Sequence, residues 1–434
     1  MPASSVPQTV DHLFRHEYGK LVSVLTRIFG THNLELAEDV VQDTLLKALE
    51  QWKFSGIPEN PSAWLFRVAK NKALDVIRHE KIHNKFAEDV SPLLKSEYTL
   101  VPIIKELFSE TEIKDDVLRM MFACCHSELP PESQVALILK TLCGFSIEEI
   151  AKAFITHDET ISKRLYRAKQ EFRESKIQFE IPSSQQIEHR LENVLTSLYL
   201  LFNEGYNSTS HSKIIRNDLV EEAVRLCYLL TENEATNLPP VNALLALMLF
   251  HAARLESRLD KEENILLLEE QDRSRWDRSL INAGIFFFEK AMHVEPDGQV
   301  SGLNGQPSLT IYHLQAAIAF QHVSAPSFEK TDWNVILQLY DLLCDRYPSP
   351  VAALNRAIAL AHVHGPLRAI EAVNAIPEKE KLKTYYLLPA TLGELYFREH
   401  DFAKARNFFE EAISLTKSQQ EKKLFERKLA KCVL

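Results

Sequence analysis

The sequence has few of the residues that build tight turns, and this scarcity excludes most β-rich folds. Only 11 of its 434 residues are glycine, whereas short β-hairpins depend on glycine-bearing turns. Alanine, leucine, glutamate and lysine, which favour helices, dominate the remainder. The composition therefore predicts an all-α protein, and a chain of this length is expected to fold as more than one domain.

Metal and disulfide frameworks are also missing. The six cysteines include no pair separated by two residues, so the sequence favours neither a zinc ribbon nor a disulfide scaffold. Cys124, Cys125 and His126 are adjacent, but neighbouring side chains on a helix point about 100° apart and offer a metal too few ligands. We therefore expect buried thiols, no metal and no cofactor.

Long apolar runs and catalytic motifs are absent as well. The longest apolar run, residues 243–250, is too short to cross a bilayer, and residues 1–10 show no leader. The sequence around His251, Arg254 and Glu256 has neither a glycine-rich phosphate loop nor a nucleophile elbow. These features predict a cytoplasmic protein that neither enters a membrane nor catalyses a reaction.

The chain has no general excess of basic residues, since its net charge is −10. A protein with this balance does not coat nucleic acid by bulk attraction, so any DNA contact needs a local basic surface. Residues 160–176 provide such a surface. Its basic side chains, which outnumber the glutamates of the same segment, are Lys163, Arg164, Arg167, Lys169, Arg173 and Lys176.

This basic segment has the pattern of the second helix of a helix-turn-helix. Ser146 and Glu149 form a capping box that starts a first helix, and the second helix is expected to begin at Thr160. The apolar stripe of the second helix consists of Ile161, Leu165, Ala168 and Phe172. Such a helix can enter the major groove. The alternative is a plain helical hairpin whose basic face is merely solvated.

Two more helices are expected upstream. The first begins near residue 36 and has apolar positions 37, 41, 45, 48 and 52 on one face. Its opposite face is acidic, which suits a basic protein partner, although a solvated face has the same pattern. The second, residues 60–78, has a basic polar side with aromatic residues among its cations.

In this order and spacing, the two helices and the helix-turn-helix resemble regions two and four of extracytoplasmic-function sigma factors, over residues 10–178. Residues 116–137 resemble a subgroup of these factors that carries a long, tetratricopeptide-like helical extension. The resemblance continues at residues 201–206, 267–277 and 349–357. It implies an all-α protein whose partners are core RNA polymerase and promoter DNA.

The resemblance also implies three sets of site residues. The set expected to bind polymerase is Glu38, Asp39, Gln42 and Asp43. The set expected to capture the minus-ten strand, with the loop at residues 54–60, is Trp64, Arg67, Lys70, Asn71, Lys72 and Arg78. The set expected at the minus-thirty-five element is Thr160, Ser162, Lys163, Arg164, Tyr166, Arg167, Lys169 and Arg173. For Trp64 the sequence favours a core position, because an aromatic residue on a helix near Leu65 and Val68 is more often core than a stacking platform.

The expected domains are region two at residues 7–90, a linker at 91–114, region four at 115–178 and a helical extension at 185–434. The breakers at 181–184 mark the start of the extension. Small residues align when residues 353–370 are laid over 391–406, at an offset typical of helix-turn-helix repeats of roughly 34 residues. Residues 390–413 resemble a tetratricopeptide repeat. Such an array would offer a protein partner, or the chain itself, a concave regulatory face.

The sequence therefore predicts a sigma factor that binds core RNA polymerase, reads and melts a two-part promoter, and is regulated by its C-terminal extension. Two other interpretations remain open. One is a helix-turn-helix DNA-binding regulator with a tetratricopeptide-like sensor domain, and the other is a repeat scaffold. The charged block at 269–278 is either a ligand-binding surface or, more simply, an ion-paired helix that holds two repeats together.

Overall fold

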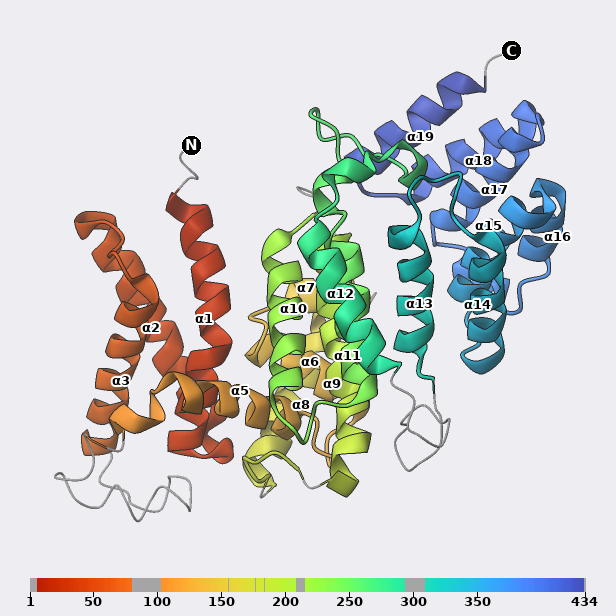
Figure 1. Cartoon of the computed structure of the whole chain (residues 1–434). Coiled ribbons are helices and arrows are strands. Elements are labelled where there is room, and N and C mark those ends of the chain that lie inside the picture. The colour runs from red at the N-terminus through yellow and green to blue at the C-terminus, as the bar shows by residue number, and fades with distance from the viewer. Residues whose placement is uncertain are drawn as a thin grey trace. The chain divides into compact units, whose positions relative to one another are not determined.

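The computed structural model describes residues 6–79, 102, 104–154, 156–175, 177–182, 184–207, 215–292 and 309–432 (Figure 1). Within these residues every named element is a helix, and an isolated β-bridge joins Leu259 to Ile265. The prediction of an all-α protein is confirmed. A helix that would span a bilayer does not occur in this part of the chain. Half of the predicted linker, residues 91–101 and 103, and also Lys176 lie outside the described residues.

The chain divides into two compact units. Unit 1 comprises residues 1–201 and 221–236, and unit 2 comprises residues 202–220 and 237–434. The predicted domain bounds remain predictions. Ile181 and Pro182 of the breaker cluster lie between two helices, and the second of these begins at Ser184. The helices up to residue 232 are α1 Val6–Phe29, η1 Thr31–Asn33, α2 Leu34–Ser55, α3 Pro61–His79, α5 Glu110–Cys124, α6 Pro131–Thr141, α7 Ile147–Ala153, α8 Asp158–Glu174, α9 Ser184–Tyr206 and α10 Asn217–Glu232.

Helices α1, α2 and α3 form a bundle around a common apolar core. The predicted inner face of α2 is correct, because Ala37, Val41, Ala48 and Trp52 are buried and Leu45 is half-buried. Helix α2 ends where Gly56 adopts a φ of 77°, a conformation that side-chain-bearing residues disfavour. This ending lets the chain turn back into α3.

Helices α5 to α8 enclose a second apolar core in unit 1. Cys124 and Cys125 are buried at the end of α5, and the Cys124 sulfur lies 3.5 Å from the Thr141 hydroxyl of α6. Burial raises the pKa of the Cys124 thiol to about 12. A thiol in this environment stays protonated, so these cysteines act as small apolar core residues.

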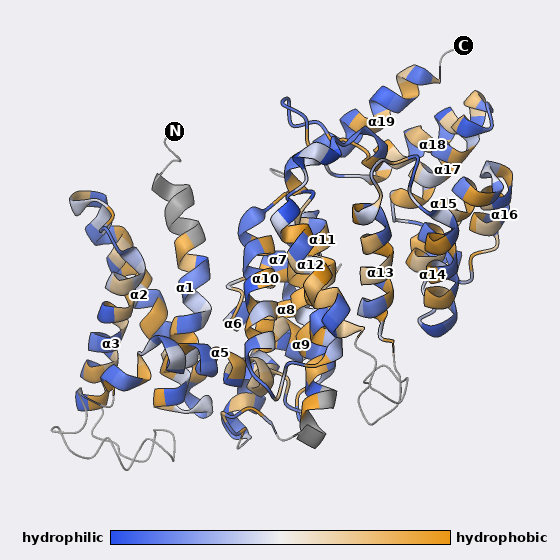
Figure 2. Ribbon diagram, viewed as in Figure 1, coloured by the Kyte–Doolittle hydropathy of each residue, from blue (hydrophilic) through white to orange (hydrophobic). Residues whose placement is uncertain are grey.

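Unit 2 continues the chain as a series of helix pairs. Its elements from residue 239 are α11 Pro239–Ala252, η3 Leu255–Ser257, η4 Leu268–Glu270, η5 Arg273–Arg275, α12 Arg278–Ala291, α13 Ile311–Ser324, α14 Trp333–Arg346, α15 Pro350–His364, α16 Pro366–Asn374, η7 Lys379–Leu382, α17 Leu387–Arg398, α18 Phe402–Leu415 and α19 Gln419–Lys431. Helix α11 is buried along most of its length, and α13 is also largely hydrophobic (Figure 2). A helix that is apolar on all sides is expected only inside a layer of other helices.

The small residues that align in the two C-terminal repeats lie at close helix contacts. Ala357, Ala369 and Ala405 are fully buried. Gly393 is buried in α17, where an added Cβ would lie 2.8 Å from the Phe409 ring of α18. Small side chains at these positions therefore let the paired helices approach closely.

The charged block at 269–278 is not the ion-paired helix expected from its sequence. It forms the short turns η4 and η5, and the guanidinium groups of Arg254 and Arg273 lie 5.4 Å and 4.7 Å from the centre of the Trp276 ring. Arg273 donates hydrogen bonds to the carbonyls of His322, at 2.7 Å, and Ala325, at 2.5 Å. The block thus joins α13 to the preceding segment through carbonyl and aromatic contacts, which a charge pattern alone does not reveal.

Candidate nucleic-acid interface

Three of the four predicted polymerase-binding residues lie on the exposed face of α2. Asp39, Gln42 and Asp43 are exposed, and the Asp43 carboxylate accepts a hydrogen bond of 2.8 Å from Lys72 of α3. Glu38 differs, because its exposed fraction is only 4% and its carboxylate is paired with Lys169 of α8. The acidic face is therefore partly occupied by the basic helix of the helix-turn-helix.

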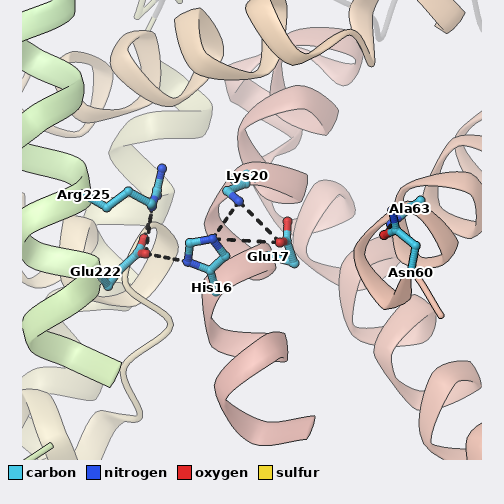
Figure 3. Close-up of polar contacts among 7 residues, drawn as sticks. All are labelled: His16, Glu17, Lys20, Asn60, Ala63, Glu222 and Arg225. Carbon is cyan, nitrogen blue, oxygen red and sulfur yellow. Dashed lines mark hydrogen bonds and ion pairs between the residues drawn. The ribbon is translucent and has the colours of Figure 1, made fainter. Parts of the chain in front are cut away.

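Helix α3 presents the predicted minus-ten residues on its polar side. It starts where the Asn60 side chain accepts a hydrogen bond of 2.9 Å from the Ala63 amide (Figure 3). Arg67, Asn71 and Arg78 are exposed, whereas Lys70 and Lys72 are half-buried. These side chains follow one another along the helix and form a basic surface suited to phosphates.

Trp64 lies at the boundary between the apolar core and the solvent-exposed surface. The residue is half-buried, and its ring meets the buried Trp52 ring edge-on at a centroid distance of 5.3 Å. The indole therefore packs against the core of region two while part of its surface still faces solvent. Both the core and the surface interpretations of Trp64 capture part of its environment.

The basic side of α3 also borders a cleft of about 960 Å³ within unit 1. Arg67 and Lys70 line it from α3, and Lys20 lines it from α1. Arg225 and Tyr228 of α10 line it from a segment that the sequence assigned to the extension. Sequence reasoning missed this contribution, because nothing in the periodicity of α10 indicates which helix it packs against.

Polar contacts hold α10 against α1 (Figure 3). Arg225 donates two hydrogen bonds to the Glu222 carboxylate, at 2.7 and 2.9 Å, and the His16 ring lies 2.8 Å from the same carboxylate. The Lys20 ammonium lies 2.9 Å from the other nitrogen of His16 and 3.3 Å from Glu17. Burial opposes ionisation of Glu222, but its bonds with Arg225 and His16 lower its pKa to about 2.

The helix-turn-helix forms as its sequence predicts. Ser146 and Glu149 make both bonds of the capping box, at 2.8 and 3.1 Å. The apolar stripe of α8 is buried at every predicted position. The helix begins at Asp158 rather than at Thr160, because acidic residues in the first turn complement the positive end of the helix dipole.

Most of the predicted minus-thirty-five residues are accessible on α8. The exposed members are Ser162, Lys163, Tyr166, Arg167 and Arg173, and Thr160, Arg164 and Lys169 are half-buried. Arg164 forms an ion pair of 2.5 Å with Glu132 and lies 5.7 Å from the centre of the Phe154 ring. Arg164 therefore braces the helix-turn-helix and is less accessible to DNA than Lys163 or Arg167.

The two predicted DNA-reading parts pack directly on each other in unit 1. Besides the Lys169–Glu38 pair, Arg173 lies 3.6 Å from Glu35 and Arg15 lies 3.2 Å from Glu149. These contacts connect α2 to α8 and α1 to α7. No sequence signal pointed to them, since each pair joins residues more than a hundred positions apart.

Backbone contacts reinforce the same packing. The Thr31 hydroxyl donates a hydrogen bond of 2.9 Å to the carbonyl of Ile177. Gly19 of α1 lies so close to Leu142, just after α6, that an added Cβ would be 2.2 Å from the Leu142 carbonyl oxygen. The approach of α1 to region four therefore depends on glycine at position 19.

Comparisons with known proteins match the same parts of the chain. Family models match at residues 13–82 for Sigma-70 region 2, at 119–172 for Sigma-70 region 4, and at 190–292 for a family of unknown function, DUF6596. A Rhizobium meliloti (strain 1021) protein described only as uncharacterized is 33% identical over 400 residues, which cover 92% of this chain and 90% of that protein. The ECF RNA polymerase sigma-E factor of Haemophilus influenzae is 30% identical over 168 residues, covering 37% of this chain and 82% of that factor.

The chain belongs to the extracytoplasmic-function sigma factors. RNA polymerase sigma factor YlaC of Bacillus subtilis is also similar, at 26% identity over 167 residues that cover 38% of this chain and 91% of that factor. No solved structure matches the chain. This sigma factor directs transcription initiation, and its family implies core RNA polymerase and promoter DNA as partners. Its extension carries the DUF6596 match.

Proposed function

We propose that this sigma factor binds polymerase through α2, captures the minus-ten strand with α3 and reads the minus-thirty-five element with α8. The observation that carries the proposal is the order of three charged helices in unit 1. Helix α2 has an acidic face, whereas α3 and α8 have basic faces in a chain whose net charge is −10. The sigma factor acts in the cytoplasm and changes no covalent bond. Its extension regulates this activity.

The acidic face of α2 suits a basic helix of polymerase. Asp39, Gln42 and Asp43 are exposed on it, and complementary charges guide the encounter of two proteins and fix their register. Lys72 neutralises part of this face through its bond to Asp43. We expect polymerase binding to release Lys72 for the DNA strand.

The basic side of α3 suits single-stranded DNA. Arg67, Lys70 and Arg78 would follow the phosphates, and capture of an unstacked base requires an aromatic or apolar surface beside them. Phe54 offers such a surface, because it is 87% exposed in the last turn of α2, where the sequence predicted the start of the loop. Trp64 anchors α3 to α2 through its ring contact with Trp52.

The packing of α8 on α2 represents a closed form of the sigma factor. Glu38 and Lys169 form an ion pair with each other, so neither side chain is available to polymerase or DNA in this arrangement. We propose that regions two and four separate before the promoter is bound. This separation would break the Glu38–Lys169 and Glu35–Arg173 ion pairs. Contacts with polymerase and promoter DNA would replace them.

The decisive experiment is transcription in vitro with core RNA polymerase, the full-length chain and the promoter region of its own gene. Lys163→Ala combined with Arg167→Ala removes two exposed cations of α8, and we expect transcripts to fall at least about tenfold because two phosphate or base contacts are lost. Arg368→Ala combined with Lys381→Ala removes two exposed cations of the extension, with exposed fractions of 72% and 63%, and serves as the matched control.

Other outcomes of this experiment identify the alternatives. Wild-type protein that binds duplex DNA but does not co-purify with core polymerase would be a conventional DNA-binding regulator. Protein that binds neither would be a repeat scaffold. Equal transcription by the α8 variant and the control would show that α8 does not read the promoter.

A further inference from the structure

Unit 2 contains a cavity that the sigma function does not use. Its volume is about 580 Å³, which lies within the range of sites for small organic ligands. The walls come from α13, α14, α15, α17 and α19, and the segment at residues 265–269 lies along one side. All of these residues belong to unit 2.

Most of the wall is apolar and aromatic. Trp333 and His362 stack face to face at a centroid distance of 3.8 Å, and both line the cavity together with Ile358 and Phe425. Flat, rigid walls of this kind bind the body of a ligand through burial of apolar surface. An apolar or aromatic ligand body fits this wall.

The cavity also contains a half-buried cation that forms no ion pair with a carboxylate among the described residues. The guanidinium of Arg258 lies 3.8 Å from the centre of the Tyr206 ring and donates a hydrogen bond to the Tyr206 carbonyl. Among the described residues no carboxylate lies within ion-pair distance of Arg258. Burial lowers the pKa of Arg258, and an anion bound beside the guanidinium would favour its charged form.

The surroundings of Arg258 strengthen the positive field. Arg254 bonds to the Gln271 amide oxygen and Arg273 to backbone carbonyls, so these two arginines also lack acidic partners within the described part of unit 2. Burial, followed by Arg254 and Arg273, lowers the pKa of His322 to about 3. His322 lines the cavity, and an anion beside it would be attracted by Arg254 and Arg273.

The carboxylates that line the cavity already bond to other groups, and Glu421 acts on Arg258 only as a nearby charge that favours the ionised guanidinium. Glu421 accepts hydrogen bonds from the hydroxyls of Tyr386 and Thr416. Glu394 is paired with Arg398 and Lys428, and Glu269 is exposed. Glu421 and Glu394 therefore already have hydrogen-bonded or ion-paired partners, whereas Arg258 forms no ion pair among the described residues.

We propose that this cavity binds a small organic anion, with its apolar or aromatic body against Trp333 and Ile358 and its single anionic group at Arg258. The site is independent of the polymerase-binding and DNA-reading surfaces, and it gives the extension a chemical signal to recognise. A carboxylate or sulfonate provides the required charge. A neutral ligand of the same shape leaves Arg258 without a counter-ion.

A matched pair of fluorescent probes tests the charge preference on the full-length protein. 8-Anilinonaphthalene-1-sulfonate carries an anion, and N-phenyl-1-naphthylamine has the same aromatic rings without it. We expect the sulfonate to bind at least about tenfold more tightly, as a hydrogen-bonded charge pair requires. We expect Arg258→Gln to abolish this difference. Equal binding of the two probes by the wild-type protein would overturn the proposal.

A second pair of variants tests the location of the site and leaves Arg258 unchanged. Ile358 and Val351 both lie on α15 with exposed fractions of 38% and 39%, but only Ile358 lines the cavity. We expect Ile358→Trp to fill the cavity and weaken sulfonate binding at least about tenfold, whereas Val351→Trp leaves it unchanged. Unchanged binding in Ile358→Trp, with a normal thermal unfolding curve, would place the probe elsewhere and refute the proposal.

Competition tests the chemical class of the ligand. We expect 1-naphthylacetate to displace the sulfonate probe and its neutral amide, 1-naphthylacetamide, to displace it at least about tenfold less well. Displacement by acidic peptides but by neither small molecule would assign the cavity to a protein partner and overturn the small-anion proposal.

Discussion

Single buried histidines give unit 2 a stability that depends on pH. His251 is half-buried with its Nδ1 atom shielded from solvent, and burial, followed by the charge of Arg254, lowers its pKa to about 3. Burial likewise lowers the pKa of His313 to about 4. In the unfolded chain the same side chains bind a proton near pH 6.5. Their contribution to stability is therefore complete above about pH 6.5 and is lost as the pH falls toward the folded-state pKa.

We therefore expect the free energy of unfolding of unit 2 to decrease from pH 7 to pH 5. Each buried histidine contributes at most about 1.4 kcal/mol per pH unit below pH 6.5. His251→Phe keeps an aromatic ring beside Tyr206 and Phe202 and removes the titrating group, so it should flatten the pH dependence. Urea unfolding followed by tryptophan fluorescence measures this slope. The same substitution at exposed His364 should leave it unchanged, and equal slopes for both variants would contradict the assignment.

At the scale of helices, the sequence predicted the local features well and the contacts between helices poorly. The capping box of Ser146 and Glu149 and the buried stripe of α8 are local patterns, because they depend on residues three or four positions apart. Glu38 and Lys169 looked like ordinary solvated charges, since nothing within either helix reveals that they meet. The block at 269–278 was misread for the same reason, because its arginines bond to distant carbonyls rather than to nearby acids.

The contact between α1 and region four offers a test of the closed form. We expect Gly19→Ala to loosen it, because the new Cβ would lie 2.2 Å from a backbone oxygen that cannot move cheaply. If the closed form limits access to polymerase, the affinity for core polymerase should rise severalfold, as measured by fluorescence anisotropy. Gly393→Ala introduces a clash of 2.8 Å with Phe409 within unit 2 and should leave this affinity unchanged. A fall in affinity for Gly19→Ala alone would argue that the packed arrangement is the one that binds polymerase.

At the scale of the whole chain, the compact units do not end where the sequence pattern changes. Unit 1 includes residues 221–236, which lie beyond the breakers at 181–184. Glu222 and Arg225 of α10 bond within this unit to each other and to His16. The family model for the extension begins at residue 190, so sequence families and physical packing divide the chain differently.

This difference predicts how truncated chains behave. A chain that ends at residue 184 loses α10 and leaves His16 and Lys20 without Glu222, whereas a chain that ends at residue 236 keeps these partners. We expect the longer chain to melt several degrees higher, because loss of a buried charged network removes a few kcal/mol and each kcal/mol shifts the midpoint by about 2–4 °C at this size. Identical melting curves for the two truncations would contradict the assignment of α10 to unit 1.

The longer truncation also isolates the role of the extension in transcription. Because it retains the contacts of unit 1, any difference between its transcription and that of the full chain reports on residues 237–434 rather than on damage to the promoter-reading helices. We expect transcription with core polymerase to change at least severalfold, either upward or downward, since a regulatory extension must alter the balance between closed and open forms. Transcription equal to that of the full chain would show that the extension does not regulate initiation, while leaving the sigma function and the anion-binding cavity untouched.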